Sequence, residues 1–68
     1  MTELFDVLGV DLTTYRVRFM DQGLDEKNAK AVRDMAVFRR GVEVEYFAVV
    51  DAGTYAEGDR HGEPSNAR

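Results

Sequence analysis

The sequence lacks cysteine and tryptophan, and it contains one histidine and one proline. Without cysteine the chain has no disulfide framework, no cysteine-based zinc site and no thiol nucleophile. A single histidine also excludes metal sites built from a histidine pair. The longest apolar run, residues 46–50, is far shorter than the roughly 20 residues of a transmembrane helix. Residues 1–6 have neither the basic nor the apolar stretch of an export signal, so we expect a soluble, cytoplasmic protein.

What is present is the composition of a small globular domain. Of the 68 residues, 44% are hydrophobic and 32% are charged, so the chain is expected to fold rather than to stay disordered. A chain of this length forms one domain at most and buries only about 60% of its unfolded surface. The net charge of −4 is uneven, because residues 13–40 are basic while residues 1–12 and 41–68 are acidic. We expect these segments to neutralise one another by packing together.

The first expected element is a short helix over residues 2–9. Thr2 is a suitable N-cap and Gly9 a suitable stop signal. The apolar side chains Leu4, Phe5 and Leu8 form one stripe along it. Because two turns of helix are marginal in isolation, this helix would depend on tertiary contacts.

Two strands are expected, over residues 14–20 and 42–50. In the first strand the apolar face alternates with a face that carries Arg16 and Arg18. The apolar residues of that strand are Tyr15, Val17 and Phe19. The second strand has one uniformly apolar face and a second face that begins with acids; the residues of this second face are Glu43, Glu45, Phe47 and Val49. Residues 54–56 are a candidate for a brief third strand.

Residues 25–40 carry every local signal of a helix. Asp25 is a suitable N-cap and Gly41 a suitable stop. The expected buried face consists of Ala29, Val32, Met35 and Ala36, with Ala31 and Phe38 at its edge. The opposite face is polar and carries Lys27, Lys30, Arg33 and Asp34. Glu26 and Lys30 stand in the favourable i,i+4 order.

These elements predict a two-layer α+β fold of the βαβ type, with one main helix packed on a sheet of two or three strands. Whether the two strands run parallel or antiparallel stays open. We expect the helix to cover the face that carries Val17 and Phe19, which leaves Met20, Phe47 and Val49 on the opposite face. Residues 1–56 form the compact domain, and residues 57–68, which are almost wholly polar, form a flexible tail. A sheet this small is expected to associate with a partner or with itself.

No residue pattern favours catalysis or a cofactor. His61 lies in the expected tail, where no rigid partner holds its tautomer. The acids around residue 53 match no calcium-binding loop, and the glycines match no nucleotide-binding motif. Glu43 and Glu45 resemble a catalytic carboxylate pair, but cross-strand ion pairs with Arg16 and Arg18 explain them more simply. We therefore expect a protein that is not an enzyme and holds no metal or cofactor.

We expect instead a protein-interaction module whose partner is another protein or protein complex, with a homodimer as a further possibility. The expected contact surface combines the polar helix face with the charged strand face. Its residues are Arg16, Arg18, Lys30, Arg33, Asp34, Glu43, Glu45 and Phe47. The alternative is a homo-oligomeric nucleic-acid-binding or regulatory accessory protein that uses the basic residues of 16–40. The net acidity and the separation of aromatic from basic side chains disfavour that alternative. The sequence also leaves open whether the acidic residues of 41–68 imitate nucleic acid.

The chain as a whole resembles the small accessory proteins of bacteriophages, a group that includes anti-CRISPR inhibitors. Residues 15–19, the following helix and residues 42–47 carry this resemblance, together with the short length and the mild acidity. It implies an inhibitor in the cytoplasm of a host cell that docks on a nuclease or a CRISPR surveillance complex. The resemblance assigns no role to any individual residue, because no family motif is matched.

Overall fold

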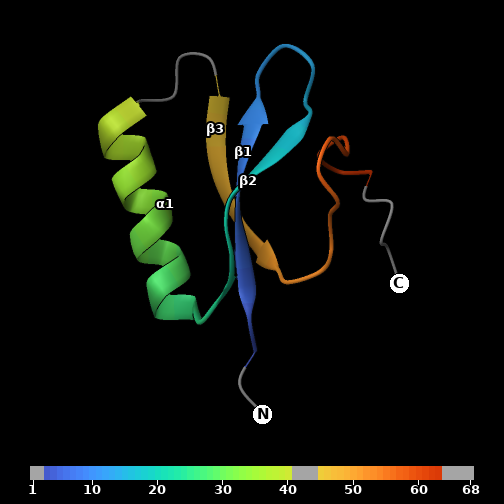
Figure 1. Cartoon of the computed structure of the whole chain (residues 1–68). Helices are drawn as coiled ribbons and strands as arrows, with labels where there is room; N and C mark the ends of the chain where they lie inside the picture. Colours follow the sequence, from blue (N-terminus) through green and yellow to red (C-terminus); the bar gives the residue numbers. More distant parts are fainter. Residues whose placement is uncertain (1–2, 41–44, 64–68) are drawn as a thin grey trace.

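The computed structural model describes residues 3–40 and 45–63, which form three strands and one helix (Figure 1). In chain order these elements are β1 (Phe5–Asp11), β2 (Val17–Leu24), α1 (Glu26–Arg40) and β3 (Glu45–Asp51). The strands form one sheet in the order β2-β1-β3, and α1 packs against it. The α+β class and the main helix are therefore as the sequence predicts.

The two strands expected from the sequence do not pair with each other. Both are hydrogen-bonded to β1, which runs antiparallel to each of them. β2 and β3 consequently run parallel on either side of β1, and α1 connects them across it. This arrangement is a βαβ unit split by a central antiparallel strand.

The predicted helix over residues 2–9 is wrong, because residues 5–11 form the central strand β1. Val7, Leu8 and Val10 are completely buried. A central strand that is covered on both faces carries apolar residues on both faces, and a short run of this kind is easily mistaken for a helix segment. Gly9, read as a helix stop, lies in the interior of the strand.

The predicted helix over residues 25–40 is confirmed. The Asp25 carboxylate accepts a hydrogen bond from the backbone N–H of Asn28 at 2.8 Å, as an N-cap does. β2 begins three residues later than predicted, because residues 11–16 form a tight turn in which Tyr15 has a φ of 60°. The Asp11 side chain holds this turn by accepting the N–H groups of Thr13 and Thr14. Of the strand expected over 42–50, residues 42–44 lie outside the described residues. Residues 54–56 form no strand.

The two faces of the sheet are the reverse of those expected. The main core cluster consists of Leu8, Val10, Val17 and Tyr55, with Phe19, Tyr46 and Val50 packed against it. It lies on the face away from α1. Because side chains alternate along a strand, Arg18 and Met20 share the other face with Phe47 and Val49, and α1 covers that face. The prediction failed because Glu45 neutralises Arg18 on the helix-covered face, where the Arg18 side chain stays 43% exposed at the margin of α1.

The segment that follows β3 covers the second face of the sheet (Figure 1). Val17 donates its N–H to the carbonyl of Asp59 at 2.8 Å and accepts the N–H of Gly58 at 3.0 Å. The Tyr46 hydroxyl lies 2.7 Å from Nδ1 of His61, whose ring stacks on Tyr55. The packed structure thus continues to residue 63, past the expected boundary at residue 56. This segment has few aliphatic side chains, so backbone hydrogen bonds and aromatic contacts attach it to the sheet.

One buried carboxylate ties the ends of the strands together. Asp6 is 5% exposed, and its two oxygens accept the backbone N–H groups of Gly23 and Gly53 at 3.0 and 3.1 Å. Both glycines have positive φ, a conformation that glycine adopts without strain. Asp6 therefore holds Gly23 and Gly53 against the central strand.

Candidate functional site: an apolar groove between α1 and β2

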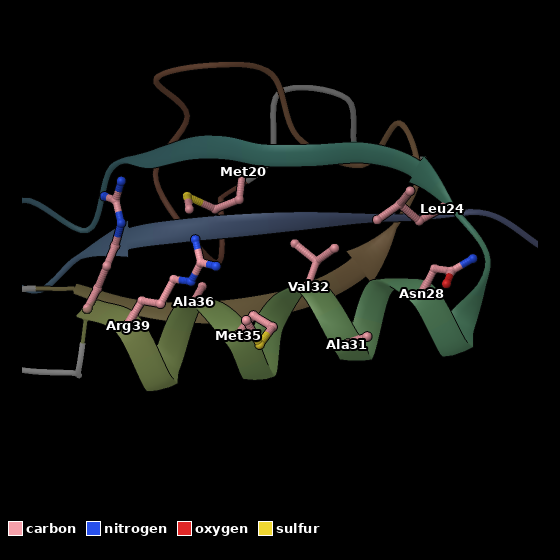
Figure 2. A pocket seen from close by; sticks show the side chains of 9 residues that line it. Met20, Leu24, Asn28, Ala31, Val32, Met35, Ala36 and Arg39 are labelled. Carbon is pink, nitrogen blue, oxygen red and sulfur yellow. The ribbon is translucent and has the colours of Figure 1, made fainter.

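A groove of about 630 Å³ runs between α1 and β2 (Figure 2). Met20 points from β2 toward the helix, and Val32 points from α1 toward the strand. The groove arises because α1 does not fill the space above edge strand β2. Its lining residues are Met20, Leu24, Asn28, Ala31, Val32, Met35, Ala36, Arg39 and Arg40. The centre of the groove is apolar, and its two arginines both come from the last turn of α1.

An apolar stripe on α1 continues the groove onto the outer surface of the helix. Ala31, Met35 and Phe38 follow one another at i, i+4 and i+7, so they lie side by side on the helix. Met35 is 49% exposed and Phe38 is 86% exposed. These three residues are called the α1 stripe below. The sequence predicted Met35 in the core and Phe38 at its edge, whereas the buried residues of α1 are Ala29 and Ala36.

An ion pair links the two edge strands of the sheet near the arginine end of the groove. Nη2 and Nε of Arg18 donate to the two carboxylate oxygens of Glu45 at 2.6 and 3.1 Å. Nη1 of Arg40 lies 3.5 Å from the same carboxylate. The hydrogen bond from Arg18, with the positive charges of both arginines, holds the pKa of Glu45 below its ordinary value, and the hydrogen bond to Glu45 raises the pKa of Arg18.

This ion pair passes directly over Gly9. In β1, Gly9 pairs with Arg18 on one side and with Phe47 on the other. A Cβ atom at Gly9 would lie 2.8 Å from an oxygen of Glu45, which is too close for an undisturbed contact. Because Gly9 has no side chain, Arg18 of one edge strand and Glu45 of the other can form an ion pair across the central strand.

The predicted contact residues do not form one surface. Arg18 and Glu45 pair as the sequence suggests, although across β1 rather than between neighbouring strands. Arg16 instead donates to the carbonyl of Gly58 at 3.1 Å. Phe47 is 7% exposed and buried under α1, so no partner reaches it. Glu43 lies outside the described residues. Lys30, Arg33 and Asp34 are on the outer side of α1, where they pair with Glu26 or with each other.

In the described part of the chain, four of the seven basic residues of 16–40 lie in ion pairs. Arg18 and Arg40 share Glu45, and Lys30 and Arg33 each have an acidic neighbour on the helix; these pairs are Arg18–Glu45, Arg40–Glu45, Lys30–Glu26 and Arg33–Asp34. A nucleic-acid surface needs unpaired cations gathered on one face. The pairing reduces the net positive charge of the basic stripe that the alternative interpretation requires.

His61 has a structural position. Its ring lies between Tyr46, whose hydroxyl bonds Nδ1, and Tyr55, on which it stacks with 5.6 Å between ring centroids. Within the ranges 3–40 and 45–63, no group of three or more histidine or acidic side chains is placed to hold a metal ion. The helix in that part of the chain is not long and apolar enough to cross a membrane.

Neither the groove nor the α1 stripe is among the sequence predictions, although a signal for them exists. The 3.6-residue period places Ala31, Met35 and Phe38 on a line that diverges from the buried line of Ala29 and Ala36. A helix with two diverging rows of apolar side chains needs two surfaces to bury them, and the sheet covers only one row. Comparison of the chain with models of protein families, with curated proteins and with solved structures finds no match.

Proposed function

We propose that this protein is a non-catalytic protein-interaction module that binds its partner through the α1 stripe and the groove between α1 and β2. The 86% exposure of Phe38 beside an open apolar groove carries this proposal. Exposed apolar patches next to a concave surface are typical of protein-binding sites. Aromatic residues and methionine are the residue types that such interfaces favour.

The chemistry of the groove supports binding rather than bond-making. Its nine described lining residues comprise apolar side chains, one asparagine and two arginines, and none of them is a nucleophile or a general base. Met20 and Met35 are flexible and polarizable, which lets them adapt to an incoming apolar side chain. Arg39 and Arg40 at one end favour a partner with an acidic group there.

The finer prediction, an inhibitor that docks on a host nuclease or a CRISPR surveillance complex, is part of this proposal. Its support is the net charge of −4 and the exposed apolar stripe on α1. Such an inhibitor would lose its effect on the nuclease when the α1 stripe is altered, and it would keep its effect when other surfaces are altered.

Affinity capture from an extract of the native cell tests the proposal. Tagged wild-type chain is compared with Phe38→Glu, which places a charge in the α1 stripe. Val37→Glu is the matched control, because Val37 is 39% exposed and lies on another side of the same helix. Circular dichroism establishes that all three chains are folded. We expect Phe38→Glu to lose proteins, including untagged copies of the chain, that wild type and Val37→Glu retain. Equal capture by all three would overturn the proposal.

A further inference from the structure

We propose that the occupant of this site is a second copy of the chain, bound through antiparallel packing of the two α1 helices. The inference rests on the proposed function and names the partner of the same site. In this dimer each Phe38 enters the groove of the other copy at the end formed by Leu24 and Asn28.

The spacing of residues on the exposed side of α1 is that of a coiled-coil seam. Asn28, Ala31, Met35 and Phe38 stand three, four and three residues apart, which is the alternation of core positions in a heptad repeat. All four are exposed, and three of them also line the groove. A seam of this kind packs against another helix of matching spacing. The described part of the chain contains no second helix that does so.

The seam is complementary to itself when two copies run antiparallel. Pairing Met35 of one copy with Ala31 of the other places a large side chain against a small one, in both directions. The same register brings Phe38, about 10 Å along the helix from Ala31, opposite Asn28 of the second copy. Asn28 and Leu24 line that end of the groove. A parallel pair would instead set Phe38 against Phe38 and Ala31 against Ala31.

The charges of α1 also favour the antiparallel arrangement. The helix is preceded by Asp25 and ends with Arg39 and Arg40, so opposite charges meet at both ends of an antiparallel pair. Arg39 lies on the groove side and comes near Asp25 of the second copy. The two helix dipoles oppose each other as well. Asp34, which approaches its counterpart near the two-fold axis, is already paired with its own Arg33 at 3.0 Å.

Sedimentation equilibrium over a micromolar dilution series tests the assembly. We expect a monomer–dimer equilibrium whose dissociation constant rises at least about tenfold in Phe38→Glu, because a charge replaces the aromatic side chain that enters the groove of the second copy. Arg39→Glu is expected to weaken the dimer, because it faces Asp25 of the second copy. Lys30→Glu makes the same charge change at a residue outside the seam, which pairs with Glu26 of its own helix, and should leave the constant unchanged.

Cross-linking tests the orientation, and the absence of cysteine from the chain gives a clean background. A mixture of the Ala31→Cys and Met35→Cys chains should form a mixed disulfide faster than either chain alone forms its own. Faster self-linking of Ala31→Cys would overturn the antiparallel pairing. A wild-type chain that is monomeric throughout, or a dimer indifferent to Phe38→Glu, would overturn the inference. If capture still depended on Phe38 in that case, the proposed function would stand and the second copy would not be its partner.

Discussion

Gly9 shows how a single missing side chain sets the local structure. The Arg18–Glu45 ion pair crosses β1 at this residue, and an added Cβ would lie 2.8 Å from a Glu45 oxygen. We expect Gly9→Ala to destabilise the fold by about 1 kcal/mol, at the low end of overpacking, because the displaced group is the end of a flexible side chain. Urea denaturation measures the change.

A second substitution tests whether the ion pair is the cause. In a Glu45→Ala background the space above residue 9 is free, so Gly9→Ala should cost nothing or stabilise the strand, since glycine is the poorer strand former. An equal cost in both backgrounds would show that Gly9 is required by the backbone rather than by the ion pair.

The same ion pair makes stability depend on pH. Arg18 lowers the pKa of Glu45 below its ordinary value of 4.5, so the folded state binds the proton more weakly than the unfolded state does. This stabilisation is complete above pH 4.5 and is lost as the pH falls through the lower pKa of the folded state. We expect the urea midpoint to fall with acidification below pH 4.5, and to fall less steeply in Glu45→Gln. Parallel pH profiles for the two chains would refute a role for Glu45.

Asp11 makes the stability of the fold depend on pH in the same direction as Glu45 does. Hydrogen bonds from the backbone N–H groups of Thr14 and Thr13 lower the pKa of its carboxyl. Because both Asp11 and Glu45 lose favourable contacts on protonation, Glu45→Gln removes one contribution and leaves the other. Some slope should therefore remain in the variant.

The charge pattern of the two strands predicts the Arg18–Glu45 pair but not the geometry of that pair. Arg18 and Glu45 were predicted as partners because their strands carry opposite charges at the same spacing. Nothing in that spacing shows that a third strand lies between them. Gly9 is consistent with a helix stop, a turn or a close contact, and only the pairing of distant segments decides among these.

At the scale of elements, the N-cap of α1 gives the clearest prediction. Asp25 accepts the N–H of Asn28 through its side chain and that of Ala29 through its backbone carbonyl, both at 2.8 Å. Asp25→Ala removes the first of these bonds and is expected to cost about 1 kcal/mol. Asp25→Ser, which keeps a side-chain acceptor, should recover most of the loss. Thermal unfolding of the three chains measures the effect, and equal melting temperatures for Ala and Ser would contradict it.

The helix was predictable and the central strand was not, for one physical reason. Residues 25–40 combine a cap with a helical period, and both act within the segment. Residues 5–11 become a strand because β2 and β3 supply hydrogen bonds on both sides, and those partners lie up to 46 residues away in the chain. Local signals decide an element only where local interactions do.

The groove follows from the same balance between elements. One helix does not cover a three-stranded sheet completely, so edge strand β2 is left with an apolar side chain, Met20, beside an open space. A sequence reading locates such a surface only when the sheet order is known. That order, β2-β1-β3, follows from the central position of β1.

At the scale of the whole molecule, residues 57–63 act as the third layer and protect an edge of the sheet. Their backbone bonds to Val17, and the Glu57 carboxylate accepts the N–H of Phe19 at 3.0 Å. Free strand edges promote pairing with other chains, and this segment occupies part of the β2 edge. A polar segment thus contributes to the fold through hydrogen bonds that composition does not reveal.

Truncated chains test whether residues 57–63 contribute to folding or are only a tail. A chain ending at residue 56 loses the contacts of Asp59, Gly58 and His61, whereas a chain ending at residue 63 keeps all of them. We expect the shorter chain to be less stable by about 2 kcal/mol, the scale of two or three partly exposed hydrogen bonds. It should also aggregate more readily, because the β2 edge is open. Urea denaturation and light scattering compare the two chains at equal concentration. If both have the stability of the full chain, residues 57–63 are a tail after all, and the third layer does not contribute to folding.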